Sequence, residues 1–309
     1  MVLAPLRRLL LPLLLGFTAC SAVSARLVEW KKREYREAAR LVEHTVRSGG
    51  HDIVYLDRGS GEPMVLVHGF GGDKDNFTLL ARHIPDRYRP VVLDLPGFGE
   101  SSRHPGDSYD IRNQAARLRE FVDAVGLARF HLAGNSMGGH LSARFAIEHP
   151  ERVLSLMLIN AAGVTSPHPS EFAVALKSGR NPLLVSTVQD FDRVLALTFV
   201  KPPNIPGFLK HYFAERAVTT RAFNDKIFGD LIQHPDPLEG ELSRLSAPTL
   251  VLWGDTDRII DVSAANVFAS GIHGANLEIL KDCGHAPMIE RPDETAQRYL
   301  AFLAALPQR

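Results

Sequence analysis

Short apolar runs alternate with amphipathic segments along most of the chain from about residue 51 onward. The runs are almost continuously apolar, which is typical of strands in a parallel sheet that is covered on both faces. We expect such strands at residues 64–68, 90–95, 129–134, 153–160 and 248–254, and one more within 276–285. Helical spacing predicts helices near 110–125 and 137–148 and a closing helix over 293–306. The pattern predicts an α/β fold with a mostly parallel sheet and helices on both faces.

Residues 163–245 interrupt this alternation. They contain no clear buried strand, and their helically spaced apolar residues are broken by proline-rich stretches such as VKPPNIPG, residues 200–207. An insertion between two core strands is expected to form a helical cap over the carboxyl edge of the sheet, where open α/β sheets bind ligands. We therefore divide the chain into a core, residues 26–162 and 246–309, and a helical cap, residues 163–245.

Residues 1–25 are expected to carry a targeting signal and are left out of the core. Two arginines precede a run of 17 residues without a charge, from Leu9 to Ala25. A helix of that length reaches roughly 25 Å, which is short for a bilayer span. A cleaved signal peptide, a lipoprotein signal that leaves Cys20 as a lipid-modified first residue, and an uncleaved membrane anchor all fit this pattern. Each predicts a location at the bacterial cell envelope or outside the cell.

Composition excludes several classes of protein. The chain has 35 Lys and Arg against 35 Asp and Glu, so the basic excess typical of nucleic-acid-binding proteins is missing. The one concentration of basic residues, 31–33, is interleaved with glutamates and is expected to form a solvated helix face. Cys20 and Cys283 are too few for a disulfide framework or a zinc site, and Cys283 is expected to be a small buried side chain. We expect no metal and no cofactor.

The stretch GNSMG places Ser136 between Gly134 and Gly138, after an expected strand and before an expected helix. This G-x-S-x-G pattern in a strand–turn–helix context is typical of a nucleophile elbow, in which a serine stands on a sharp turn at the edge of the sheet. A serine hydroxyl needs a base within hydrogen-bonding reach to act as a nucleophile. In this kind of fold the acid and the histidine follow the serine in the chain.

His285 is the expected base, because the DCGHAP segment follows the last expected strand at the same edge of the sheet as the elbow. The loop after the preceding strand offers Asp255, Asp257 and Asp261 as the acid. We select Asp257, since Asp255 is expected to fix the loop and Asp261 to cap the following helix. The alternative position for the acid, one strand earlier, holds Asn160, whose neutral amide cannot stabilise an imidazolium.

The HGFGG loop, residues 68–72, follows the first deep strand and lies where a second oxyanion donor belongs. The backbone N–H groups of Phe70 and Met137 are expected to form the oxyanion hole, in which one donor is typically worth about 3 kcal/mol. We expect His68 to shape this loop without a chemical role.

Five motifs together resemble the serine α/β-hydrolase superfamily. They are HGFGG (68–72), DLPGFGES (94–101), GNSMGG (134–139), WGDTD (253–257) and GHAPM (284–288). Within that superfamily the chain is most similar to bacterial lipases typified by those of cold-adapted Moraxella and Psychrobacter, and to the related membrane-bound monoacylglycerol lipases. The similarity covers roughly residues 50–305, including cap residues 181–206 and residues 288–292. It implies hydrolysis of carboxylic esters through an acyl-enzyme by Ser136, Asp257 and His285, with no cofactor.

The expected function is hydrolysis of lipid esters, such as monoacylglycerols or medium-chain acyl esters. Phe70, Met137, Phe199 and Pro287 are expected to line the substrate site. The expected partners are the ester substrate and, through the N-terminal segment, a membrane surface; nucleic acid and metal are not expected. Alternatives are a small-ester esterase, a carbon–carbon bond hydrolase of ring-cleavage products with the same triad, acyl transfer to an alcohol, and a binding module with a vestigial triad.

Overall fold

Eight strands form one sheet in the order β1-β2-β4-β3-β5-β6-β7-β8. The computed structural model describes residues 7–307, with side chains from Val23 onward. Strands β3 to β8 run parallel, and β2 joins β4 in the antiparallel direction. The bounds are β1 (Val42–Ser48), β2 (His51–Asp57), β3 (Glu62–Val67), β4 (Tyr88–Leu93), β5 (Phe130–Asn135), β6 (Val153–Ile159), β7 (Thr249–Gly254) and β8 (Asn276–Leu280). The predicted mostly parallel α/β fold is confirmed.

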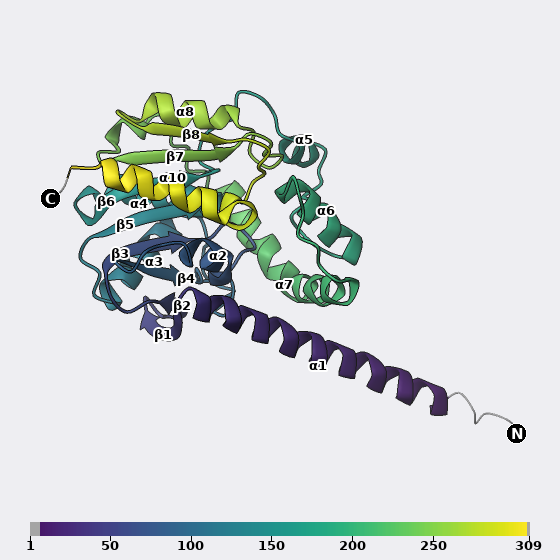
Figure 1. Ribbon diagram of the computed structural model, residues 1–309. Helices are drawn as coiled ribbons and strands as arrows, with labels where there is room; N and C mark the ends of the chain where they lie inside the picture. The colour runs from purple at the N-terminus through teal and green to yellow at the C-terminus, as the bar shows by residue number, and fades with distance from the viewer. Residues whose placement is uncertain (1–6, 308–309) are drawn as a thin grey trace, which may run out of the picture.

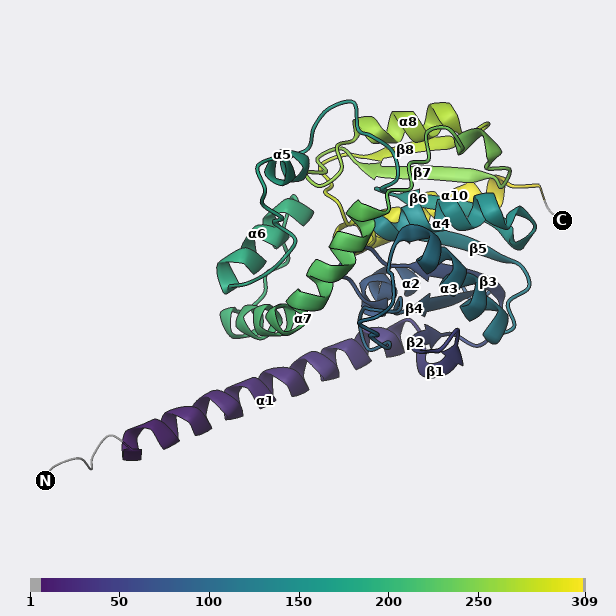
Figure 2. The same ribbon diagram turned by 180° about the vertical axis from the view of Figure 1, so that it is seen from behind.

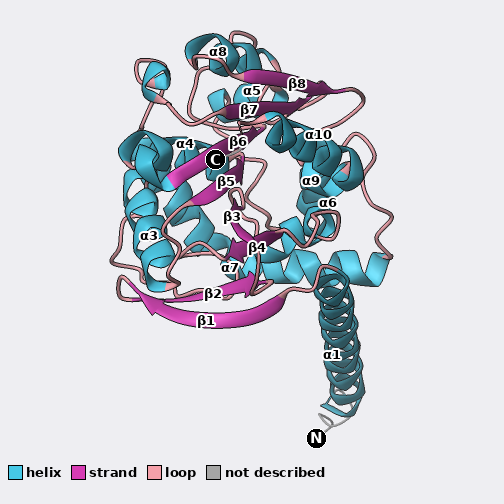
Figure 3. Cartoon of the chain, turned by 60° about the vertical axis from the view of Figure 1, so that its left-hand side comes forward, coloured by secondary structure: helices cyan, strands magenta, loops and turns pink. Residues whose placement is uncertain are grey.

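Helices cover both faces of the sheet, as Figures 1 and 3 show. One face carries α3 (Ile111–Ala124), α4 (Met137–Glu148) and α8 (Ser263–Gly271), and the other carries α2 (Thr78–Ala81), α9 (Pro287–Glu290) and α10 (Pro292–Ala305). Each face has its own buried cluster, one around Phe145 and Phe268 and one around Phe77 and Tyr299. Because both faces are buried, the central strands are apolar throughout, as the sequence pattern indicates.

The β1–β2 hairpin at the edge of the sheet was not among the expected strands. Its turn is Gly49-Gly50, with φ of 53° and 81°, and Ser48 pairs with His51 across it. Two consecutive residues with positive φ are typical of tight hairpin turns. Most of β1 is exposed. The strand therefore lacks the continuous apolar run by which the buried strands were identified.

Three helices lie between β6 and β7 and form a group at one end of the sheet (Figure 2): α5 (Glu171–Lys177), α6 (Val188–Thr198) and α7 (Gly207–Gln233). This stretch is fully described and contains no strand. Short 3₁₀ turns occur at Lys74–Phe77, Pro150–Arg152 and Leu242–Arg244. The end of α6 reaches the core, because the His285 N–H donates a hydrogen bond to the Thr198 carbonyl at 2.7 Å.

The N-terminal helix α1 (Arg7–Ala38) projects away from the body of the molecule (Figures 1 and 2). It runs without a break through the predicted boundary after residue 25. Of the predicted targeting segment, residues 1–6 lie outside the described residues, and only the backbone is described for residues 7–22. Among the described residues, no helix combines the length and the apolar character needed to cross a bilayer.

The basic stretch of α1 is not simply a solvated face. Lys32 pairs with Asp73 at 3.3 Å and with Asp75 at 2.9 Å, and Arg36 pairs with Asp75 at 2.6 Å. Burial works against the charged form of Lys32, yet the Asp73 and Asp75 carboxylates raise its pKa above the usual range. The expectation of a solvated face is wrong for Lys32, because its partners lie some 40 residues away in the chain.

Candidate active site

Ser136 occupies the single residue between β5 and α4. Its φ of 57° and ψ of −122° lie in a region that is unfavourable for a non-glycine residue, and such a conformation costs on the order of 1–3 kcal/mol. The turn is held in place because the Ser136 N–H donates to the Ile159 carbonyl at 3.0 Å, while the Ser136 carbonyl accepts from Gly139 and His140. The side chain is half-buried. This geometry matches the sharp strand-to-helix turn predicted for a nucleophile elbow.

The glycines beside Ser136 are required by close packing. A Cβ on Gly134 would lie 2.1 Å from the Gly138 carbonyl oxygen, and a Cβ on Gly138 would lie 2.4 Å from the carbonyl oxygens of Val67 and His68. These neighbours are backbone atoms that no rotamer change can move away. The strand, the helix and the loop after β3 therefore approach one another only because Cβ atoms are missing at these positions.

His285 and Asp257 form a buried pair at the same edge of the sheet. The His285 Nδ1 lies 2.7 Å from the Asp257 Oδ2, and the two residues are 6% and 5% exposed. A carboxylate in this contact accepts the proton of Nδ1, which leaves Nε2 of His285 as the basic nitrogen. The structure thus brings together the acid and the base that the sequence selected from separate loops. The backbone N–H groups of Ile259 and Ile260 donate to the other oxygen, Oδ1, at 2.8 and 3.0 Å.

Asn160 supports this pair in a way that sequence reasoning missed. Its Nδ2 donates to Asp257 Oδ2 at 2.7 Å and lies 3.3 Å from the Gly284 carbonyl, just before His285. Asn160 is fully buried and has a φ of 46°. The sequence alone presents this position only as an alternative place for the acid. The amide that excludes the acidic role is what allows Asn160 to donate a hydrogen bond to the acid.

A second amide joins the elbow to the histidine loop. Asn135, the residue before Ser136, donates through Nδ2 to the His285 carbonyl at 3.0 Å and to the Ile159 carbonyl at 3.1 Å. Ser136 and His285 are therefore tied together through one side chain, although they are far apart in the chain. This contact fixes the spacing between the elbow and the histidine loop.

The loop after β3 lies directly beside the elbow. A Cβ on Gly69 would lie 3.0 Å from the Ser136 Cβ, so the next residue, Phe70, is close to the serine. Met137 is the first residue of α4, and its N–H cannot have a partner within the helix. Within residues 7–307, neither the Phe70 N–H nor the Met137 N–H has a hydrogen-bond acceptor. Both amides are therefore free to bind an oxyanion.

His68 shapes this loop from beneath. The Leu95 N–H donates to Nε2 of His68 at 3.0 Å, so the proton of the imidazole is on Nδ1, which donates to the Gly69 carbonyl at 2.8 Å. Complete burial lowers the pKa of His68. The neutral ring is therefore hydrogen-bonded to two loops at once, in agreement with the structural role expected for it.

An apolar cavity of about 440 Å³ opens at Ser136 between the core and the cap. Core residues Phe70 and Met137 line it together with cap residues, among them Phe172, Leu176, Leu183 and Phe228. Phe228 of α7 packs edge-on against Phe70, with ring centroids 5.6 Å apart. The loop that carries the Phe70 N–H is thus in direct contact with the cap.

Phe199 and Pro287, two other residues expected at the substrate site, do not line this cavity. Both are buried, and Phe199 packs into the core cluster on the opposite face of the sheet from α4. The Phe199 Cα lies 3.1 Å from the position of a Cβ on Gly284. Phe199 therefore lies behind the His285 loop.

A buried ionic network forms part of the cavity lining. His140 and Asp236 line the cavity, and the Asp236 carboxylate accepts from Arg144 Nε and Nη2 at 2.7 and 2.9 Å. Burial raises the pKa of Asp236, but hydrogen bonds from His140 and Arg144 outweigh it and lower the pKa to about 2. This network joins α4 to the residues that follow α7 and contributes polar groups to the cavity lining.

Cys283, two residues before His285, is not a nucleophile. It is fully buried, and burial raises the pKa of its thiol to about 12. A thiol that stays protonated at neutral pH does not attack an ester. The structure agrees with the expectation of a small buried side chain.

Comparison with known proteins places these features in context. A family model described as the alpha/beta hydrolase fold matches residues 62–185. Lipase 1 of Psychrobacter immobilis is 37% identical over 265 residues, which cover 84% of this chain and 83% of the relative. A monoacylglycerol lipase of Xenopus laevis is 33% identical over 312 residues, which cover 96% and 93% of the two chains.

A solved structure extends the comparison to three dimensions. The crystal structure of a membrane phospholipase A, described as a novel bacterial virulence factor, has a TM-score of 0.90 and 46% sequence identity. The match covers 97% of this chain and 98% of that chain. These matches confirm the resemblance predicted from the motifs, and they extend across the cap as well as the core.

Proposed function

The chain belongs to the α/β-hydrolase family, and from this premise we propose that it hydrolyses carboxylic esters of lipids, with Ser136, His285 and Asp257 as its triad. The observation that carries the proposal is the opening of an apolar cavity of about 440 Å³ at a serine on a strained elbow, beside a buried His–Asp pair. The curated relatives support it, since they are a lipase and a monoacylglycerol lipase and match most of the chain.

In the proposed reaction, the Ser136 Oγ attacks the ester carbonyl carbon while Nε2 of His285 takes its proton. The carbonyl oxygen becomes an oxyanion, which the N–H groups of Phe70 and Met137 stabilise. Collapse of this intermediate breaks the bond to the alcohol, which leaves with the proton from His285. Water then attacks the acyl-enzyme, again with His285 as the base. Collapse of this second intermediate breaks the bond to the Ser136 Oγ, which takes the proton back from His285, and the fatty acid is released. Asp257 orients the imidazole and stabilises its charged form throughout.

The acyl chain is proposed to lie in the cavity beneath α5 and α7. Phe172, Leu176 and Leu183 from the cap and Ile259 and Ile260 from the core supply an apolar lining. Burying a methylene group yields about 0.8 kcal/mol, which corresponds to roughly fourfold in kcat/KM for each methylene that gains cover. The substrate class that fits is a monoacylglycerol or a medium-chain acyl ester.

The decisive measurement is kcat/KM of the purified full-length chain on p-nitrophenyl esters from acetyl to palmitoyl and on a monoacylglycerol. Ser136→Ala is expected to abolish turnover, and Ser178→Ala, at an exposed serine at the end of α5, serves as the matched control. We expect kcat/KM to rise toward medium or long chains. Activity confined to acetyl and butyryl esters would make the protein a small-ester esterase. A folded protein that hydrolyses no ester would refute the proposal.

The site of action is proposed to be the cell envelope or the exterior of a bacterial cell, with the N-terminal segment in contact with a membrane. The uncharged run from Leu9 to Ala25 supports this location. Fractionation of cells that express the wild type or Cys20→Ser distinguishes a cleaved signal peptide, a lipoprotein signal and an uncleaved membrane anchor. A Cys20→Ser chain that stays membrane-bound at full length would rule out the lipoprotein version.

A further inference from the structure

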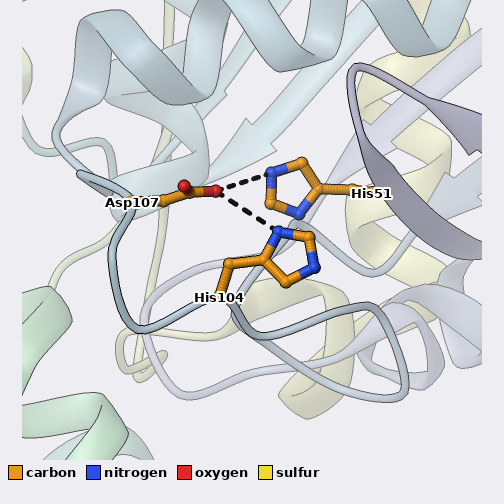
Figure 4. A group of neighbouring side chains, drawn as sticks. All are labelled: His51, His104 and Asp107. Atoms are coloured by element: carbon orange, nitrogen blue, oxygen red, sulfur yellow. Dashed lines mark ion pairs between the residues drawn. The ribbon is translucent and has the colours of Figure 1, made fainter.

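Three side chains with metal-binding groups gather away from the active site, where the β1–β2 hairpin meets the loop between β4 and α3 (Figure 4). They are His51, the first residue of β2, and His104 and Asp107 of the loop. Their ligand atoms all lie within 4.8 Å of one another. The loop is held against β2, because the Ser102 N–H donates to the Asp52 carbonyl at 3.0 Å. His104 and Asp107 are three residues apart, whereas His51 comes from a separate hairpin, so no single local motif predicts the group.

Two of the ligand-atom separations in this cluster are compatible with a tetrahedral metal ion. Asp107 Oδ2 lies 3.1 Å from His51 Nε2 and 3.5 Å from His104 Nδ1, as the dashed lines in Figure 4 indicate. A tetrahedral ion with bonds of 2.0–2.1 Å places its ligand atoms about 3.3 Å apart. The two observed separations lie on either side of that value. The two imidazole rings are stacked with centroids 4.5 Å apart, so both lie on the same side of the Asp107 carboxylate as neighbours.

Hydrogen bonds within the protein do not satisfy the cluster. His51 is 2% exposed, and its Nδ1, which points toward His104 in Figure 4, has no hydrogen-bond partner among the described residues. A buried polar atom without a partner is unfavourable by about 1–3 kcal/mol. Asp107 Oδ2 is therefore the one partner that the described residues offer to the His51 ring, and the same oxygen also faces His104 Nδ1.

We propose that His51, His104 and Asp107 bind one divalent transition-metal ion of the Zn²⁺ type, through Nε2, Nδ1 and Oδ2 respectively. Two imidazoles and one carboxylate select such ions over Mg²⁺ and Ca²⁺, which prefer ligand sets made of oxygen atoms. The side chains of His104 and Asp107 are 43% and 35% exposed, so an ion enters from solvent and water completes its coordination. Arg117 Nη2, 3.5 Å from the same Oδ2, holds the carboxylate in place but adds a positive charge nearby, which moderates the affinity.

The ion would link the core to the cap through the loop between β4 and α3. Lys226 of α7 donates to the Asp107 carbonyl at 2.6 Å, and the Tyr109 N–H donates to Asp230 of α7 at 2.9 Å. The same loop would then be held by the sheet on one side, through the ion and His51, and by α7 on the other. Binding of the ion is therefore expected to raise the thermal stability of the protein.

The test is direct measurement of metal binding to the full-length chain after treatment with a chelator. Calorimetry with Zn²⁺ is expected to show one ion per chain, and Co²⁺ is expected to give the visible absorption of a low-symmetry site. His104→Gln removes a ligand from an exposed side chain and should weaken binding by more than about 100-fold, since even residues that only support a ligand change affinity 10- to 100-fold. His168→Ala, at an exposed histidine elsewhere, is the matched control and should bind as the wild type does.

Asp107→Asn supplies an independent variant, and the melting temperature of each folded protein with and without Zn²⁺ is the second readout. The expected result is a Zn²⁺-dependent rise in the wild type and in His168→Ala that is missing in His104→Gln and Asp107→Asn. Equal binding by His104→Gln and the wild type would overturn the proposal, as would folded wild-type protein that shows no saturable binding. Loss of binding only in His285→Ala would place the ion in the active site and refute the proposal as well. None of these readouts depends on esterase activity.

Discussion

Replacement of Gly138 by alanine tests whether close backbone packing builds the oxyanion hole. The added Cβ would lie 2.4 Å from the carbonyl oxygens of both Val67 and His68, about 1 Å short of the 3.4 Å at which ordinary contact begins. Neither neighbour is a side chain that can rotate away. Gly138 is the second residue of α4, and His68 is two residues before Phe70. The helix and the loop must therefore separate, and Met137 and Phe70 separate with them.

Loss of alignment of one oxyanion donor costs about 3 kcal/mol of transition-state stabilisation, or on the order of 10²-fold in kcat. A displacement of about 1 Å at a reacting group has a similar effect. We expect kcat of Gly138→Ala on a medium-chain ester to fall by about 10²-fold, with a much smaller change in KM, because the loss is confined to the transition state. Circular dichroism and gel filtration select the folded protein for the assay.

Gly207→Ala is the matched control. Gly207 is the first residue of α7, and apart from its chain neighbours and the backbone of its own helix no atom lies within 4 Å of the position of its Cβ. Alanine is a better helix former than glycine, so stability should be unchanged or slightly higher and kcat unchanged. Folded Gly138→Ala with the kcat of the wild type would refute the view that this contact sets the oxyanion hole.

Two further predictions concern the polar network around the site. Asn160→Ala removes the 2.7 Å hydrogen bond to Asp257 and should lower kcat about tenfold with KM nearly unchanged. Asn160→Asp places a second carboxylate beside Asp257 and should move the acid limb of the pH profile of kcat/KM to higher pH. Identical pH profiles for the wild type and Asn160→Asp would contradict this role of Asn160. Asp236→Asn leaves Arg144 without its main buried partner and should lower the free energy of unfolding at pH 7 by about 3 kcal/mol, near the lower end for a buried pair, because Glu241 still accepts from Arg144 at 3.0 Å. Since the pKa of Asp236 is lowered from 3.8 to about 2 on folding, its contribution is complete above pH 4 and is lost as the pH falls toward 2. The difference between wild type and variant in urea unfolding should therefore narrow over that range, and a constant difference would contradict the assignment.

The local sequence predicts a feature of the site wherever the backbone conformation of neighbouring residues creates that feature. The glycines on either side of Ser136 are neighbours of the serine in the chain, so the elbow can be read from five residues. The apolar runs likewise predicted the central strands, because burial on both faces leaves no polar positions in them. His285 and Asp257 could be selected because the carboxyl ends of parallel strands meet at one edge of the sheet.

Contacts between distant segments could not be read in the same way. The donor role of Asn160 depends on Asp257, which is 97 residues away in the chain. The helical pattern predicts a solvated Lys32 because it contains no information about the distant partners Asp73 and Asp75. Phe199 has the apolar character of a substrate contact, but only the path of α6 decides that it packs behind the His285 loop.

The sequence by itself determined the fold class and the elbow, and it carries the proposed order of Ser136, Asp257 and His285, because each depends on periodicity or on a short motif. Only the tertiary structure decided which cap residues face Ser136, which amide supports the acid, and that His51 meets His104 and Asp107. The physical reason is that these contacts are set by the packing of separate elements. Side-chain identity alone does not say which of many chemically equivalent partners the fold will bring within 3 Å.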